Sequence, residues 1–204
     1  MTRSPTTRPR TARPQPTHSR LTRRLANAAD EPFIRSTIMT DRAAQFMDTG
    51  LDPSALDSLL ELQYLAQCRE YATRYPGAAQ ELVESGGVAV GRIITAIDGG
   101  CLHLVDILIA DAYRRLGIGS QVLTDLCECA DAAGAPITLT VWAQNTGALR
   151  LYERHGFHRV DDGAQGGYLG MRREARGNIF QAAHSVHEVP VPEVSVPEVP
   201  VQEG

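Results

Sequence analysis

The chain has 204 residues, of which 43% are hydrophobic, and its formal net charge is −4. This length and apolar content suffice for one hydrophobic core, so we expect one domain with terminal extensions. The longest apolar run lies near Leu102 and is interrupted by Asp106, so no membrane-spanning segment and no membrane partner are expected.

The charges are distributed unevenly along the chain. Residues 1–17 carry four arginines and no acid, whereas residues 175–204 carry one arginine and four glutamates. The part between them is mildly acidic, which favours a cationic or amine substrate and argues against nucleic acid as a partner. No set of stacking aromatic residues accompanies the basic N-terminal segment, which also disfavours a nucleic-acid-binding tail.

The four cysteines, Cys68, Cys101, Cys127 and Cys129, follow no spacing typical of metal ligands. We therefore expect reduced thiols in a cytoplasmic protein, and no metal site. The sequence places no basic residue where it would lower a thiol pKa, which disfavours an acyl-cysteine intermediate.

The N-terminal residues 1–17 combine arginines and prolines without an apolar period, which predicts a disordered extension. An organelle transit peptide is an alternative, although the prolines interrupt the amphipathic helix that it needs. A natural start downstream of Met1 also remains open. The folded domain is expected over residues 18–174.

The first half of this domain is predicted to contain a strand, two helices and a β-meander. The strand covers residues 20–25, and the first helix begins with Asp30 at its N-cap and Pro32 in its first turn. The second helix runs from Pro53 to Arg74, with one apolar side formed by Leu56, Leu59, Leu60, Tyr64 and Cys68. Three strands follow over residues 80–84, 88–97 and 102–109, separated by glycine pairs.

A glycine-containing segment, Tyr113-Arg114-Arg115-Leu116-Gly117-Ile118-Gly119-Ser120, connects the last of these strands to a helix. Glycines let backbone amides approach an anion, and a helix N-terminus favours negative charge. The segment therefore predicts a diphosphate site. An ordinary strand-to-helix turn is the alternative for this string when it is taken alone.

The second half continues with a β-branched strand over residues 137–142 and a short helix. Asn145 is expected to cap this helix, and Gly156 follows its end. Short strands are predicted over residues 158–160 and 168–171, joined by a loop at 161–163. Residues 175–204 end in a Val-Pro-Glu-Val repeat, which predicts a disordered, extended tail, with docking to a partner as the alternative.

Two motifs together resemble a known family. Arg114-x-x-Gly117-x-Gly119 and Asn145-x-x-Ala148-x-x-x-Tyr152-x-x-x-Gly156-Phe157 are similar to motifs A and B of the GNAT superfamily of acyl-coenzyme-A-dependent N-acetyltransferases. The resemblance implies an α+β GNAT fold with about four helices and a mixed sheet of about six to seven strands, splayed at the motif A strand.

The activity that the resemblance implies is transfer of an acetyl group from acetyl-coenzyme A to a primary amine by direct attack. The acceptor would be a small-molecule or peptide amine, and the protein a monomer or homodimer. A non-catalytic module that binds coenzyme A and acts as a sensor or scaffold remains an alternative.

The resemblance also implies roles for residues on the coenzyme side. The loop residues Arg114, Arg115, Leu116, Gly117, Ile118, Gly119 and Ser120 would hold the diphosphate. The backbone of Ile107, Leu108 and Ile109 would bind the pantetheine arm and face the thioester oxygen, and Asn145 would contact the pantetheine amide. Tyr152 matches the family tyrosine that protonates the departing thiolate, with a buried structural tyrosine as the competing interpretation.

The acceptor side is less well defined by the sequence. His103 falls where some family members place a strand glutamate that acts as a base through water, although a histidine on such a strand is also a common surface residue. Asp106 has the opposite strand parity from His103 and is expected to bind the incoming cation. Gln63 and Gln67 lie on the second helix and form either a solvated face or part of the acceptor site.

Overall fold

The structure is a computed structural model that describes residues 20–46, 50–160 and 166–177. The expected 1–17 extension, the 161–163 loop and most of the 175–204 tail lie outside these residues. No helix in the described ranges is both long enough and apolar enough to cross a membrane.

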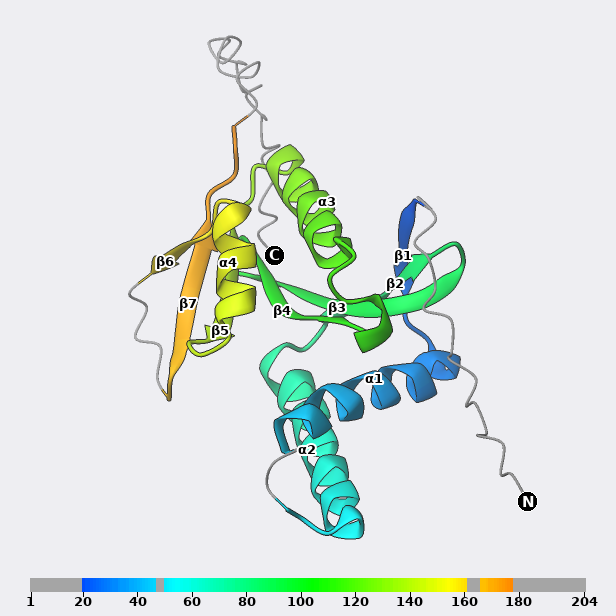
Figure 1. Cartoon of the computed structure of the whole chain (residues 1–204). Coiled ribbons are helices and arrows are strands. Elements are labelled where there is room, and N and C mark those ends of the chain that lie inside the picture. The colour runs from blue at the N-terminus through cyan, green and yellow to red at the C-terminus, as the bar shows by residue number, and fades with distance from the viewer. Residues whose placement is uncertain (1–19, 47–49, 161–165, 178–204) are drawn as a thin grey trace, which may run out of the picture.

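A seven-stranded sheet forms the centre of the fold, in the order β1-β2-β3-β4-β5-β7-β6 (Figure 1). Neighbouring strands are antiparallel except β4 and β5, which are parallel. The strands are β1 (Leu21–Leu25), β2 (Ala79–Ser85), β3 (Val88–Asp98), β4 (Cys101–Ile109), β5 (Ile137–Trp142), β6 (His158–Val160) and β7 (Tyr168–Arg173). This mixed sheet confirms the predicted α+β class.

In the described ranges, four α-helices cover the two faces of the sheet (Figure 1). Helices α1 (Glu31–Ala43) and α2 (Pro53–Arg74) lie on one face, and α3 (Ile118–Ala132) and α4 (Thr146–Arg154) on the other. Leu82 and Val83 follow each other on β2 and belong to the two different cores, because successive side chains of a strand point to opposite faces.

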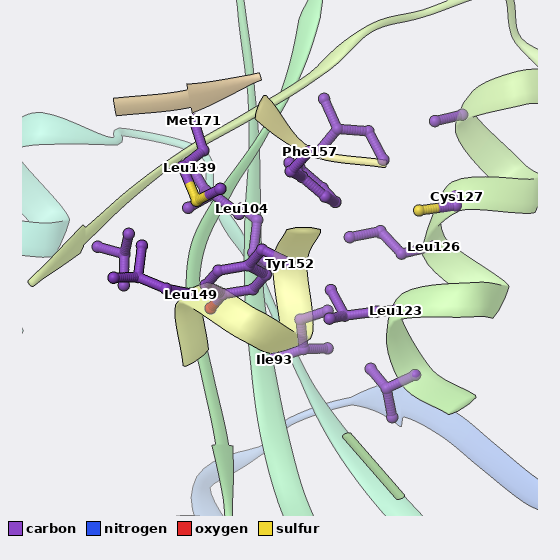
Figure 2. Close-up of a cluster of buried hydrophobic side chains, with 14 of the residues drawn as sticks. Ile93, Leu104, Leu123, Leu126, Cys127, Leu139, Leu149, Tyr152, Phe157 and Met171 are labelled. Carbon is purple, nitrogen blue, oxygen red and sulfur yellow. The ribbon is translucent and has the colours of Figure 1, made fainter. Parts of the chain in front are cut away.

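The larger core joins α3 and α4 to the sheet. Figure 2 shows Leu123 of α3 and Tyr152 of α4 among side chains of the strands, including Ile93 and Leu104. The ring centroids of Tyr152 and Phe157 are 5.7 Å apart. This packing fixes α4, and with it Tyr152, against the middle of the sheet.

Helix α2 has the bounds that the sequence predicts. The Asp52 side chain accepts hydrogen bonds from the amides of Ser54 and Ala55, and Pro53 occupies the first turn, where no amide hydrogen is needed. Leu60 and Tyr64 are buried as expected. Cys68, one turn further along the same side, is exposed.

Asp30 occupies the N-cap position of α1 but makes no side-chain capping bond there. Its carboxylate accepts hydrogen bonds from both terminal nitrogens of Arg24, each at 2.7 Å, and from the Asn27 amide at 2.8 Å. Asn27 caps the short 3-10 turn that precedes the helix. The Asp30 carboxylate, which the sequence predicts to cap α1, therefore binds the Arg24 guanidinium instead.

A β-bulge in β4 changes the orientation of the residues that follow it. Thr95 pairs with Leu104 and Ile94 pairs with Asp106, which leaves Val105 as the extra residue. As a result His103 and Asp106 lie on the same face of the sheet, the face covered by α2. The predicted opposite parity of these two residues is wrong for this reason.

Candidate functional site

The splay between β4 and β5 opens a groove of about 820 Å³. β5 pairs with β4 only through residues 102–104, so the edge of β4 from Val105 to Ile109 has no neighbouring strand on that side. Ile107, Leu108 and Ile109, which the resemblance assigns to the pantetheine arm, all line the groove. A free strand edge of this kind offers amides and carbonyls to an extended ligand.

The loop before α3 presents consecutive amides to the same groove. Within the described part of the chain, none of the amides of residues 115–120 donates a hydrogen bond to another protein group. Arg115 and Gly117 have φ angles of 63° and 82°, in the left-handed region, which turns successive amides toward one side. Together with the N-terminus of α3, this loop forms a cradle whose chemistry fits a diphosphate.

The side chain of Arg114 lines the groove but already has partners within the protein. Its Nε donates to the carbonyl oxygen of Ile109 at 2.9 Å, and its Nη2 lies 2.5 Å from the carboxylate of Asp41 on α1. The guanidinium therefore connects the loop, the end of β4 and α1. This contact places the Arg114 side chain as an anchor of the loop, with its charge already paired.

Three other arginines supply positive charge to the groove. Arg115, Arg150 and Arg154 all line it, and none has a carboxylate within ion-pair distance in the described ranges. The sequence analysis missed Arg150 and Arg154. Their spacing of four residues on α4 puts them on one side of the helix, and that spacing was the available signal.

Tyr152 lies deep in the groove with only 8% of its surface exposed. Burial raises the pKa of its phenol well above the usual value, with a smaller contribution in the same direction from Asp106. The hydroxyl therefore keeps its proton throughout the neutral range. Asn145 also lines the groove, and its side chain caps α4 by accepting a hydrogen bond from the Ala148 amide at 3.0 Å.

A second cavity of about 660 Å³ adjoins the groove. The two share Asp41, Asp106, Leu108, Trp142 and Asn145 as lining residues. Asp106 stands at this junction, where its Oδ2 accepts a hydrogen bond from Arg92 Nη2 at 2.6 Å. The second cavity is further lined by Ile38, Arg42, Gln45, Gln67, Arg92, Gln144 and Tyr168.

Trp142 and Tyr168 form an exposed aromatic pair at this second cavity, with ring centroids 5.1 Å apart in an edge-on arrangement. The ring of Trp142 packs so closely on Gly167 that a Cβ there would lie 2.7 Å from it. The sequence analysis missed both aromatic residues, which face each other only because β5 pairs with β7.

His103 lies outside both cavities. Its Nε2 is 3.1 Å from the Tyr75 hydroxyl, its Nδ1 is 2.9 Å from Thr138 Oγ1, and its ring stacks on that of Tyr75. Burial lowers the pKa of the imidazole below its usual value. The structure does not bring this predicted base to the groove.

The two predicted glutamines are in different positions. Gln67 lines the second cavity, and its Nε2 donates to the Tyr71 hydroxyl at 2.8 Å. Gln63 lines neither the groove nor the second cavity, but its Oε1 accepts a hydrogen bond from Arg42 Nη1 at 3.4 Å. Gln63 thus touches the second cavity only through Arg42.

The described residues contain no group of three or more His, Cys, Asp or Glu side chains that would hold a metal ion. All four cysteines are free thiols, and burial raises the pKa of Cys127, the one within the larger core. None of the four lines the groove or the second cavity.

The family model described as Acetyltransferase (GNAT) family matches residues 41–157, more than half of the chain. This chain belongs to the GNAT acetyltransferase family. The match includes the cradle loop, Asp106 and Tyr152, so the groove belongs to the part of the chain that defines the family.

Two curated relatives of this GNAT protein are acetyltransferases. N-alpha-acetyltransferase 40 of Saccharomyces cerevisiae is 33% identical over 89 residues, which are 39% of this chain and 30% of the yeast protein. Mycothiol acetyltransferase of Geodermatophilus obscurus is 30% identical over 144 residues, 62% of this chain and 44% of that protein. The chain thus spans less than half of the length of either relative.

A solved structure of similar fold is the PaiA N-acetyltransferase of Thermoplasma acidophilum in complex with coenzyme A. It superposes with a TM-score of 0.58, at 15% identity, over 76% of this chain and 99% of that chain. This similarity confirms the GNAT fold.

Proposed function

We propose that this protein transfers an acetyl group from acetyl-coenzyme A to a primary amine by direct attack, with residues 18–174 as the catalytic unit. One observation carries the proposal. The groove at the β4–β5 splay joins a cradle of unpartnered amides to the buried hydroxyl of Tyr152, and a second cavity meets it at Asp106.

The coenzyme would be held by backbone more than by side chains. The amides of residues 115–120 suit the diphosphate, and the free edge from Ile107 to Ile109 suits the amides of the pantetheine arm. Arg115, Arg150 and Arg154 are available for the remaining phosphate charge. Asn145 stands beside this path and would contact the pantetheine arm.

The amine would enter through the second cavity and meet the thioester at Asp106. The carboxylate there lines both cavities and would bind the incoming ammonium and accept its proton, directly or through water. Because His103 lies outside both cavities, we assign this role to Asp106 instead. The free amine then attacks the thioester carbonyl carbon, and its oxygen becomes an oxyanion facing the amide of Ile107 or Leu108.

Tyr152 would act when the carbon–sulfur bond breaks. The tetrahedral intermediate collapses with expulsion of the thiolate, and the Tyr152 hydroxyl donates its proton to the sulfur. Burial keeps that proton in place beforehand, because it raises the phenol pKa. The attacking nitrogen loses its second proton to water, Asp106 releases the ammonium proton to solvent, and the phenolate takes a proton from solvent, so one turnover releases one proton net.

Free-thiol release from acetyl-coenzyme A, measured across a panel of amines, tests this function. We expect thiol release that depends on the added amine and that falls by roughly 10²-fold in Asp106→Asn, the scale typical of a positioned acid or base. Acetyl-coenzyme A binding without amine-dependent thiol release for any amine would favour the non-catalytic sensor or scaffold.

A further inference from the structure

Three buried polar atoms of the described residues have no hydrogen-bond partner: Arg42 Nε, Gln67 Oε1 and Arg92 Nε. They come from α1, α2 and β3, and all three residues line the second cavity. Buried polar groups are almost always paired in native proteins, because an unpaired one loses its hydration without compensation. Three residues with such atoms line a single cavity, and this coincidence favours a ligand that pairs with them.

The charges around the cavity define one side of that ligand. Of its carboxylates, Asp41 is paired with Arg114 and Asp106 with Arg92. Arg42 has no carboxylate within ion-pair distance among the residues that the structure describes, and its Nη1 is held by the neutral Gln63. The cavity therefore contains one cation whose charge no described side chain balances.

The Arg92 side chain is held in place before any ligand binds. Its side chain is 4% exposed, with Nη1 3.3 Å from Gln80 Oε1 and Nη2 on Asp106. With both ends fixed, the unpaired Nε keeps its direction without a ligand. The unpaired atoms thus comprise two guanidinium N–H donors and one amide oxygen, which complement an anionic group and an N–H group.

We propose that the acceptor amine also carries a carboxylate, bound by Arg42 with Arg92 Nε as an additional donor, so that the substrate class is an amino acid. The inference rests on the proposed acetyl transfer. The planar guanidinium of Arg42 pairs with a carboxylate through parallel hydrogen bonds, Gln67 Oε1 accepts an N–H of the same molecule, and Asp106 receives the ammonium. A polyamine would instead place a second ammonium against Arg42.

Matched acceptors test this assignment through kcat/KM. Each free amino acid is compared with its own amide, which keeps the amine and side chain and removes the negative charge, and with its decarboxylated amine. We expect the free amino acid to react at least about 10-fold better than its amide, since a charge-assisted bond is lost.

The variant Arg42→Gln identifies the residue responsible. It should lower kcat/KM for the amino acid by about 10- to 100-fold, to the value of the amide, and change the value for the amide little. Arg69→Gln, at an exposed position of α2 that lines neither the groove nor the second cavity, is the matched control and should change neither. Thermal unfolding of both variants verifies that they are folded.

The outcomes separate this inference from the proposed function. Equal reaction of acids, amides and decarboxylated amines would overturn the carboxylate while acetyl transfer stands. A preference for amines bearing phosphate over those bearing carboxylate, abolished in Arg42→Gln, would also overturn it in favour of phosphate. If no amine reacts, acetyl transfer fails. Calorimetric titration of amino acids in the presence of coenzyme A then tests the carboxylate site by itself. Binding to the wild type that is lost in Arg42→Gln would support the site, and absence of binding to the wild type would overturn it.

Discussion

Arg92 on β3 and Asp106 on β4 form an ion pair across 2.6 Å, just beyond the bulge at Val105. The bulge turns Asp106 to the face of α2, and Arg92, which is opposite Leu108, reaches it diagonally across the two strands. Arg92 is almost fully buried, whereas Asp106 keeps 23% of its side chain exposed. The pair therefore places a carboxylate at the junction of the two cavities while leaving one side of it open.

Replacing Arg92 by Met should destabilise the protein, because Asp106 would lose its partner in a poorly solvated place. We expect the free energy of unfolding to fall by about 2–4 kcal/mol, below the upper range for fully buried pairs because Asp106 is partly exposed. Urea denaturation measures this, with Arg69→Met as the control that changes stability by less than about 0.5 kcal/mol. A stability equal to that of the wild type would show that the pair contributes nothing net.

Gly117 and Gly134 provide a matched pair for testing the cradle. Both have a positive φ, 82° and 63°, and a Cβ at either would meet no atom within 4 Å. Val at either position should therefore carry a similar backbone penalty of about 1–2 kcal/mol. Only Gly117→Val places a side chain in the groove, so it alone should abolish the rise in melting temperature that coenzyme A produces by binding the native state. The same ligand-induced rise in both variants would place the diphosphate elsewhere.

The unpaired arginines of α4 should contribute to coenzyme affinity through charge. Arg150→Gln and Arg154→Gln are each expected to raise the Kd of coenzyme A by about 3- to 10-fold, since both side chains are exposed and partly screened. Calorimetry at low and high salt measures this, and the wild type should show the steeper salt dependence. Identical Kd values for the variants and wild type at low salt would exclude these arginines from the site.

His103 should make stability depend on pH. Burial lowers its pKa in the native state, so the unfolded chain, with a histidine pKa of about 6.5, binds a proton that the native state excludes. The free energy of unfolding should thus decrease as the pH falls through about 6.5, and His103→Asn should show a smaller decrease. Denaturation of both proteins from about pH 8 to about pH 5 gives the difference. If the free energy of unfolding of the wild type rose relative to that of the variant as the pH falls, the predicted role of His103 would be contradicted.

The same variant checks the assignment of the base. Because His103 lies outside both cavities, His103→Asn should keep kcat for amine acetylation within about 3-fold of the wild type. A loss of about 10²-fold with native coenzyme binding would return the role of base to His103.

The sequence predicts the fold well where local signals act alone. Asp52 and Pro53 define the start of α2, and Asn145 that of α4, because capping depends on neighbouring residues. The loop from Arg115 to Ser120 was likewise predicted, since glycine spacing and the following helix lie within one short segment.

Features that depend on pairing between distant segments were not predictable in this way. The bulge at Val105 exists only in the register between β3 and β4, and it moved Asp106 to the face of His103. The contact between Arg114 and Asp41 joins residues 73 positions apart, so no local pattern predicts it. Arg42 and Arg92 lie far apart in the sequence, and only the folded structure shows that both line the second cavity.

Tyr152→Phe is the most direct test of the central claim that the groove at the splay performs acetyl transfer. The substitution keeps the ring that packs on Phe157 and removes only the hydroxyl. Measured on an acceptor that the wild type acetylates, the Kd of acetyl-coenzyme A should stay the same while kcat falls by roughly 10²-fold. Wild-type kcat in the Phe variant would contradict the account, because the thiolate would then be reprotonated by another group or by solvent.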